Sequence, residues 1–308
     1  VVIAGQVGVG ALGTDAFQEV DLVGVSQPIT KWSYQIRSAA DVAWAVSKAF
    51  YIARSGRPGP VVLDFPKNAQ QGLTEWQSVD HVSLRSYHPY PTISVEAVAQ
   101  AAELINHARR PLALVGQGVE LAGAQAELAA FLERADIPAA RTLLGLSALS
   151  TFHPLNMGMV GMHGNYAPNM KTQECDVLIA VGMRFSDRVT GNLATYARQA
   201  KVIHLDIDVT EIDKNVKTDV AVLGDCRQTL AAITDRLEPA KHTEWISSFG
   251  KYADMERQKV IEPAIHPTTG PLLMGEVINE VAEQTQANAI LVNDVGQNQM
   301  MSCRYFKY

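Results

Sequence analysis

The stretch Val177-Leu178-Ile179-Ala180-Val181-Gly182-Met183-Arg184 decides the fold. The apolar run Val177–Val181 predicts a strand, and the glycine that follows predicts a turn at its carboxyl end. The same pattern recurs on both sides of it, with helix-period segments between the apolar runs. Strands are predicted at Leu112–Val115, Ala139–Leu143, Val177–Val181, Val202–Asp206 and Val220–Leu223, and helices at Ser94–His107, Ala124–Arg134 and Cys226–Leu237. This alternation predicts an α/β fold with a doubly wound parallel sheet.

Further elements are predicted on either side of this region. Towards the N-terminus we expect strands at Val1–Ala4 and Pro60–Phe65 with a helix at Asp41–Arg54 between them, and the unbroken apolar start of the second strand indicates burial on both faces. Towards the C-terminus we expect a helix at Pro271–Thr285 and a buried strand at Ala289–Asn293. Two polar, proline-bearing stretches, Gln70–Thr92 and Glu238–Pro271, are interpreted as surface linkers, although a helix at Glu244–Lys259 is also compatible with the pattern.

The composition excludes several protein classes. At 308 residues the chain exceeds the size of a usual single core, so two or three domains are expected. A net charge of -6 argues against nucleic-acid binding, and no apolar run reaches the length of about 18 residues that a membrane span needs. Three widely separated cysteines indicate reduced, cytoplasmic thiols, and the eight histidines show no metal-ligand spacing.

Polar and glycine-rich groups follow the predicted strands of the central region. Carboxyl ends of parallel strands share one sheet edge, where such groups could hold an extended, nucleotide-like ligand. The alternative is that glycine and aspartate simply make turns, and for any single group this alternative is favoured. The groups are Gly116-Gln117-Gly118, Thr142-Leu143-Leu144-Gly145, Gly182-Met183-Arg184-Phe185, Asp206-Ile207-Asp208 and Gly224-Asp225.

Three further features could bind anions or flat ligands. Arg184 and Arg188 could clamp a carboxylate or phosphate, or could form surface ion pairs. The stretch Met157–Gly164 could cover an aromatic ligand, or its methionines could fill the core. Lys67, which follows a predicted strand, could reach an anion, or could be solvated.

In combination, the motifs of the chain resemble the catalytic large subunit of acetohydroxyacid synthase (acetolactate synthase), a thiamine-diphosphate enzyme of branched-chain amino-acid (isoleucine, leucine and valine) biosynthesis. The motifs are Gly13-Thr14-Asp15-Ala16-Phe17-Gln18-Glu19, Ser55-Gly56-Arg57-Pro58-Gly59-Pro60-Val61, Asp64-Phe65-Pro66-Lys67, Gly161-Met162-His163-Gly164, Arg184-Phe185-Ser186-Asp187-Arg188-Val189-Thr190-Gly191, His204-Leu205-Asp206-Ile207-Asp208 and Asp294-Val295-Gly296-Gln297.

The resemblance implies a domain organisation. Residues 1–75 correspond to the C-terminal half of a pyrimidine-binding domain, 92–238 to a complete, Rossmann-like central domain that holds FAD, 239–270 to a linker and 271–308 to the start of a diphosphate-binding domain. The chain is therefore expected to be an internal fragment. The family's active site lies between subunits, so a homodimer or tetramer is expected, with a regulatory small subunit as a further partner.

The resemblance also implies residue roles. Catalytic positions are Gln18, Lys67 and Arg188, and Arg188 would engage the carboxylate of the second 2-ketoacid, pyruvate or 2-ketobutyrate. Phe17, Met162 and His163 would line the substrate channel. The expected FAD contacts are Arg57, Gly116, Gly118, Thr142, Leu143, Arg184, Arg188, Asp206, Ile207 and Asp225, and those to thiamine diphosphate are Val295, Gly296, Gln297 and Asn298.

Some parts of the family pattern differ or are missing. Gly8, Ser186, Asn298 and Met301 stand where the family usually has Pro, Asp, His and Trp. The glutamate that protonates thiamine would precede Val1, and the Mg²⁺ ligands would follow Tyr308, so the chain alone is expected to be inactive. The alternatives are glyoxylate carboligase, a flavin-free catabolic acetolactate synthase or another thiamine-diphosphate carboligase and, in a different class, a non-catalytic FAD- or nucleotide-binding module.

Overall fold

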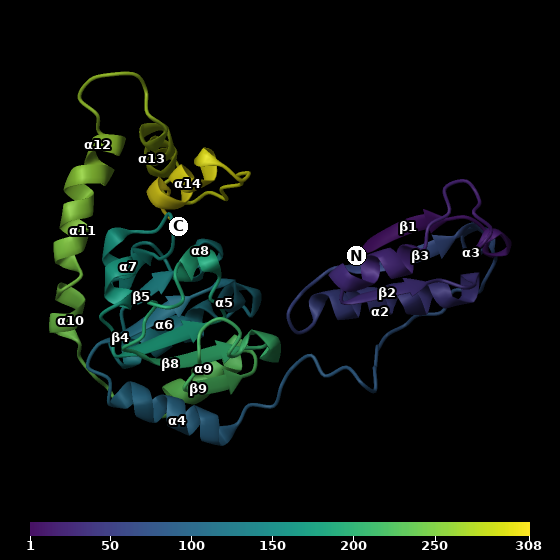
Figure 1. The fold of residues 1–308 in the computed structure, drawn as a ribbon, viewed down its shortest axis with the longest axis horizontal. Coiled ribbons are helices and arrows are strands. Elements are labelled where there is room, and N and C mark those ends of the chain that lie inside the picture. Colours follow the sequence, from purple (N-terminus) through teal and green to yellow (C-terminus); the bar gives the residue numbers. More distant parts are fainter. The chain divides into compact units, whose positions relative to one another are not determined.

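The computed structural model describes all 308 residues, which fall into two units, Val1–Tyr90 and Pro91–Tyr308. Both are α/β units with parallel sheets, as the sequence predicts (Figure 1). None of the helices combines the length and the apolar character that crossing a bilayer requires.

The first unit contains a three-stranded parallel sheet in the order β1-β3-β2. Its strands are β1 (Val2–Gln6), β2 (Trp32–Gln35) and β3 (Val61–Pro66), and its helices are α1 (Leu22–Ser26), α2 (Val42–Arg54) and α3 (Lys67–Gln71). The central strand β3 is buried along Val61–Asp64 because α2 packs against it through Ala45, Ala49 and Ile52. The predicted strands at Val1–Ala4 and Pro60–Phe65 are confirmed, whereas the polar, aromatic strand β2 escaped the sequence analysis.

The second unit is built on a six-stranded parallel sheet in the order β6-β5-β4-β7-β8-β9. In chain order this is 3-2-1-4-5-6, the arrangement of a doubly wound nucleotide-binding sheet, with its switch point between β4 and β7. The strands are β4 (Pro111–Val115), β5 (Ala139–Arg141), β6 (Asn156–Met159), β7 (Val177–Val181), β8 (Lys201–Asp206) and β9 (Val220–Leu223).

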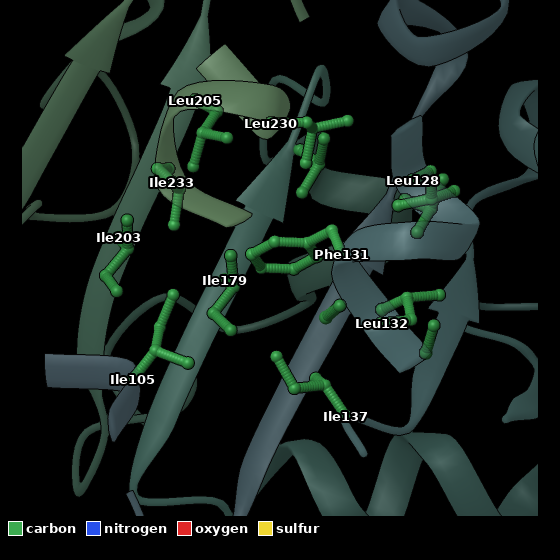
Figure 2. Packing of buried hydrophobic residues seen from close by; sticks show 14 of the residues in the cluster. Ile105, Leu128, Phe131, Leu132, Ile137, Ile179, Ile203, Leu205, Leu230 and Ile233 are labelled. Atoms are coloured by element: carbon green, nitrogen blue, oxygen red, sulfur yellow. The ribbon is translucent and has the colours of Figure 1, made fainter. Parts of the chain in front are cut away.

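Helices cover both faces of this sheet, so its central strands are fully apolar. On one face, Phe131 of α6 extends toward Ile179 of β7 within a cluster that also includes Ile105, Leu230 and Ile233 (Figure 2). The other face packs against α7, α10 and Phe249. The helices up to the end of the sheet are α4 (Val95–Asn106), α5 (Gln117–Leu121), α6 (Gln125–Arg134), α7 (Tyr166–Thr172), α8 (Asp187–Thr190) and α9 (Cys226–Thr234).

Residues 243–265 are almost continuously helical, which supports the helical alternative for Glu244–Lys259. They form α10 (Thr243–Ser247), α11 (Gly250–Glu256) and α12 (Glu262–Ile265), with a π-helical turn at Arg257–Ile261. The anchor of this column is Lys171 of α7, which is 5% exposed. Its Nζ lies 5.0, 5.9 and 5.4 Å from the ring centroids of Trp245, Phe249 and Tyr252, and bonds Glu174 at 2.7 Å.

The last part of the chain forms α13 (Met274–Gln284) and α14 (Gln297–Tyr305). An ion pair between Arg304 and Glu256 holds α14 against the helix α11. Just after α14, the backbone of Tyr308 makes two hydrogen bonds of 2.9 Å with Thr151. The predicted buried strand at Ala289–Asn293 is wrong: the segment is irregular, and Ile290 and Val292 are 94% and 87% exposed. A parallel strand needs a neighbour for its backbone groups, and no strand of the chain pairs with this segment.

Candidate functional site

The carboxyl edge of the six-stranded sheet gathers most of the predicted FAD contacts. Gly116 follows β4, Thr142 follows β5, Arg184 lies just beyond β7, Asp206 ends β8 and Asp225 lies just beyond β9. Since all six strands are parallel, these residues share one edge, on both sides of the switch point. At the same edge, Gly118 lies in the first turn of α5, Leu143 begins a 3₁₀ helix and Ile207 directly follows β8.

The glycines at the switch point pack against one another. A Cβ on Gly116 would lie 2.2 Å from the carbonyl oxygen of Gly182, and a Cβ on Gly118 would lie 2.6 Å from the Cα of Gly182. The backbone N–H of Gly118 also donates to the Gly182 carbonyl at 3.0 Å. Close backbone packing therefore explains why no side chain is tolerated at Gly116 and Gly118, so glycine at these positions is not by itself a sign of a bound phosphate.

The β8–β9 side of the edge is acidic. Asp206 is 8% exposed; its Oδ1 accepts from the Asp208 N–H at 2.9 Å, and its Oδ2 lies 3.6 Å from Nε2 of the buried His204. Asp225 caps α9 by accepting from the Arg227 N–H at 3.0 Å. Burial, and then the charges of Asp206 and Asp225, raise the pKa of the Cys226 thiol to about 12. Two carboxylates on neighbouring strands suit ribose hydroxyl groups.

The β5 side is shaped by Arg141, which the sequence analysis missed. Its guanidinium is buried, and its Nη1 donates to the carbonyls of Leu146 and Leu149 at 2.7 and 2.8 Å. Burial lowers the pKa of Arg141 to about 10, so the group remains charged at neutral pH. Arg141 thereby fixes the 3₁₀ segment Leu143–Ala148, which begins with the predicted contact Leu143.

The predicted substrate-side residues of this unit meet beyond β6 and β7. The N–H of Met162 donates to the carbonyl of Arg188 at 2.7 Å, which joins the loop of Met162 and His163 to α8. The side chains of Met162, Arg184 and Arg188 are exposed, and Asp187 lies 3.8 Å from the Arg188 guanidinium. The segments that follow β6 and β7 thus carry the exposed side chains of two arginines and a methionine, and guanidinium groups suit anionic ligands.

In the first unit, Phe17 and Gln18 follow the carboxyl end of β1 and Lys67 follows that of β3, whereas Arg57 precedes β3 and so lies at the amino end of this sheet. Lys67 opens α3 directly after β3, and Arg57 lies in the exposed turn that precedes β3. Phe17 is 88% exposed, and Gln18 adopts φ 65° in the loop between β1 and α1. Hydrogen bonds from Gln6 to the Val20 carbonyl, at 2.7 Å, and from the Val9 N–H to Asn68, at 3.0 Å, tie this loop to the end of the sheet.

The predicted thiamine-diphosphate contacts form an exposed turn in the second unit. Gly296, at φ 147°, precedes Gln297 and Asn298 in the first turn of α14, and the Val295 side chain is solvated. Only glycine adopts this conformation readily, so the turn brings bare backbone to the surface. No group of three or more His, Cys, Asp or Glu side chains is arranged to hold a metal ion.

Comparison with known proteins identifies the central region. Residues 98–233 match the family model described as the thiamine pyrophosphate enzyme, central domain. The chain is 38% identical over 309 residues to the acetolactate synthase large subunit of Lactococcus lactis. It is 40% identical over 316 residues to the probable acetolactate synthase large subunit of Methanocaldococcus jannaschii, and 36% over 312 residues to the acetolactate synthase isozyme 3 large subunit of Escherichia coli.

These alignments include the whole of the chain but only 53–54% of each relative, so the chain spans about half the length of the curated relatives it matches. The resemblance inferred from the motifs is thus confirmed. Residues 98–233 thus correspond to the central domain of a thiamine pyrophosphate enzyme, and the chain is similar, along its whole length, to about half of an acetolactate synthase large subunit.

Proposed function

We propose that the chain contributes to an acetolactate synthase. The enzyme decarboxylates pyruvate and joins the product to a second 2-ketoacid, giving 2-acetolactate from pyruvate or 2-aceto-2-hydroxybutyrate from 2-ketobutyrate. The observation that carries this proposal is the similarity to acetolactate synthase large subunits along the whole chain. The geometry supports it, because a backbone hydrogen bond joins the loop of Met162 and His163 to Arg188 beyond the carboxyl ends of β6 and β7.

The second unit would bind FAD along the carboxyl edge of its sheet. Arg184 offers a guanidinium to the anionic diphosphate, and Asp206 and Asp225 offer carboxylates to ribose hydroxyls. Thr142, Leu143 and Ile207 would line the ligand between these groups, and Gly116 and Gly118 would contribute backbone atoms. The donor set at the edge fits a dinucleotide, since cationic and acidic groups lie on different strands.

The remaining residues would serve the substrate. Arg188 would hold the carboxylate of the second 2-ketoacid with its two-pronged guanidinium, and Met162 and His163 would cover it. Gln18, Lys67 and Phe17 would line the approach to the reacting atoms. Thiamine diphosphate would be held beside Val295–Asn298 and would supply the electron sink that decarboxylation of a 2-ketoacid needs. The enzyme would act in the cytoplasm as a homodimer or tetramer, with a regulatory small subunit.

A chimera tests the activity. This chain replaces the aligned 309 residues of the Lactococcus lactis large subunit, and acetolactate is measured with pyruvate, thiamine diphosphate, FAD and Mg²⁺. We expect acetolactate formation that Arg188→Ala reduces by about tenfold or more, the effect of a lost charge-assisted pair, and that Arg198→Ala leaves unchanged. A folded, flavin-containing chimera that forms no acetolactate would contradict the proposal.

A further inference from the structure

The loop that carries Met162 and His163 is held at one residue, Gly161, by a side chain of α7. The Oδ1 atom of Asn169 accepts from the Gly161 N–H, and its Nδ2 donates to the Gly161 carbonyl, both at 2.9 Å. A carboxamide that satisfies both backbone groups of one residue acts like a strand neighbour. Gly161 therefore has a fixed orientation relative to α7.

The opposite side of Gly161 lies against the backbone of Arg188. Gly161 adopts φ 106°, and a Cβ at this position would lie 2.7 Å from the Arg188 carbonyl oxygen. That carbonyl accepts the hydrogen bond from the Met162 N–H. The backbone of Gly161 is thus held between the Asn169 carboxamide and the Arg188 backbone, to which the Met162 N–H is also bonded.

The start of α7 is itself anchored, so Asn169 acts from a rigid support. The buried carboxylate of Glu256, from α11, accepts from the Tyr166 N–H at 2.9 Å and from Asn165 Nδ2 at 3.3 Å. Asn165 in turn bonds both backbone groups of Met159, its Oδ1 at 2.8 Å and its N–H at 2.7 Å. The chain of contacts runs from α11 through α7 to the loop and ends at Arg188.

We propose that Asn169 is a positioning residue: it sets Met162 and His163 against Arg188 and so shapes the subsite for a 2-ketoacid carboxylate. This inference rests on the proposed role of Arg188. Asn169 itself does not touch the substrate; it acts through Gly161. Loss of the Asn169 side chain should therefore weaken the hydrogen bond between the Met162 N–H and the Arg188 carbonyl, although Asn169 contacts neither group.

Hydrogen exchange of the purified chain tests the positioning directly. In Asn169→Leu we expect the Met162 amide to exchange about tenfold faster or more, since two hydrogen bonds to Gly161 are lost. Asn169→Asp keeps an acceptor for the Gly161 N–H but has no donor for its carbonyl, so its effect should be intermediate. Unchanged Met162 exchange in Asn169→Leu would overturn the inference.

The matched control is Asn106→Leu. Asn106 makes a similar pair of bonds at the amino end of the sheet: its Nδ2 donates to the Arg236 carbonyl at 3.2 Å, and its Oδ1 accepts from the Glu238 N–H at 3.0 Å. Its loss should speed exchange of Glu238 and leave Met162 unaffected. Faster Met162 exchange in both variants would mean general destabilisation and would also overturn the inference.

Ligand binding is measured with ¹³C-methyl methionine, with Met162→Leu identifying the signal. Pyruvate should shift the Met162 methyl resonance in the unmodified chain, in Asn106→Leu and in Asn169→Leu. The pyruvate concentration that gives half of the shift should be several-fold higher for Asn169→Leu than for the other two proteins. Equal titrations of the unmodified chain and Asn169→Leu would contradict the subsite role. If pyruvate fails to shift the signal in the unmodified chain, the proposed role of Arg188 fails, and Met162 exchange still decides the positioning.

Discussion

Single glycine residues determine how closely the strand ends approach at the switch point. Gly182 adopts φ 57°, and a Cβ there would lie 2.7 Å from the Cα of Gly118; Gly191 has nearly the same φ, 58°, with no atom within 4 Å. We expect Gly182→Ala to lower the free energy of unfolding by roughly 3 kcal/mol, the sum of backbone strain and overpacking, and Gly191→Ala by about 1 kcal/mol from strain alone. Urea denaturation measures both. Equal losses would show that the close packing contributes nothing.

Two buried thiols should make the free energy of unfolding fall as the pH rises into the alkaline range. Burial, followed by the charge of Asp176, raises the pKa of Cys175 from 9.0 to about 12, and burial with Asp206 and Asp225 does the same to Cys226. Below pH 9 both thiols carry their protons whether the chain is folded or unfolded. Between pH 9 and about 12 only the unfolded chain releases them, so the free energy of unfolding falls as pH rises, by up to about 1.4 kcal/mol per pH unit for each thiol.

Urea midpoints measured from pH 8 to pH 10.5 check this dependence, which Cys226→Ala should reduce. A slope that is the same with and without the Cys226 thiol would contradict the assignment.

At this scale the sequence identified residues that follow strands, because a turn after an apolar run places them at the sheet edge. It did not identify Arg141, Asn169 or Glu256. The side chains of Arg141 and Asn169 bond backbone groups 5 to 8 residues away, and Glu256 bonds a backbone N–H 90 residues away. Sequence motifs do not record such pairings. The sequence also could not tell whether Gly116 and Gly118 are glycines because a ligand approaches their backbone or because the backbone of Gly182 does.

At the scale of elements, the helical column α10–α12 depends on one lysine. Lys171 lies among three aromatic rings, and Trp245 also donates from Nε1 to the Pro111 carbonyl at 2.8 Å. Lys171→Ala should lower the free energy of unfolding by roughly 2 kcal/mol, from lost cation–π contacts and lost packing of the lysine stem. The exposed pair of Lys201 with Asp219, at 2.8 Å, offers the control, and Lys201→Ala should cost less than about 1 kcal/mol. Equal costs, measured by urea denaturation, would contradict the anchoring role.

Long apolar runs predicted the elements best. Val177–Val181 and Val220–Leu223 begin and end where the sequence places them, because helices on both faces demand continuous apolar residues. The strand β6 was missed since Asn156–Met159 lacks such a run and its glycine, Gly158, has φ 104°. Ala289–Asn293 has a strand's composition without a paired neighbour, and hydrophobic pattern alone does not report pairing.

At the scale of the molecule, the chain contains two parallel-sheet units, and residues 98–233 of the second match the thiamine pyrophosphate enzyme central domain. The α/β class was predictable because alternating strands and helices permit few arrangements. The strand order was not predictable, because after each crossover helix the next strand can join the sheet on either side of the previous strand. The division into pyrimidine-binding, central, linker and diphosphate-binding parts remains a prediction.

The most direct test of the account is an equilibrium titration of the purified chain with FAD, followed by the quenching of flavin fluorescence. We expect saturable binding with one FAD per chain, weakened about tenfold or more by Arg184→Ala, since a guanidinium–diphosphate pair is lost. Arg198→Ala, which removes an exposed arginine near the amino end of β8, should leave the affinity unchanged. Absence of saturable binding, or equal affinities for both variants, would contradict a flavin site at the carboxyl edge of the sheet.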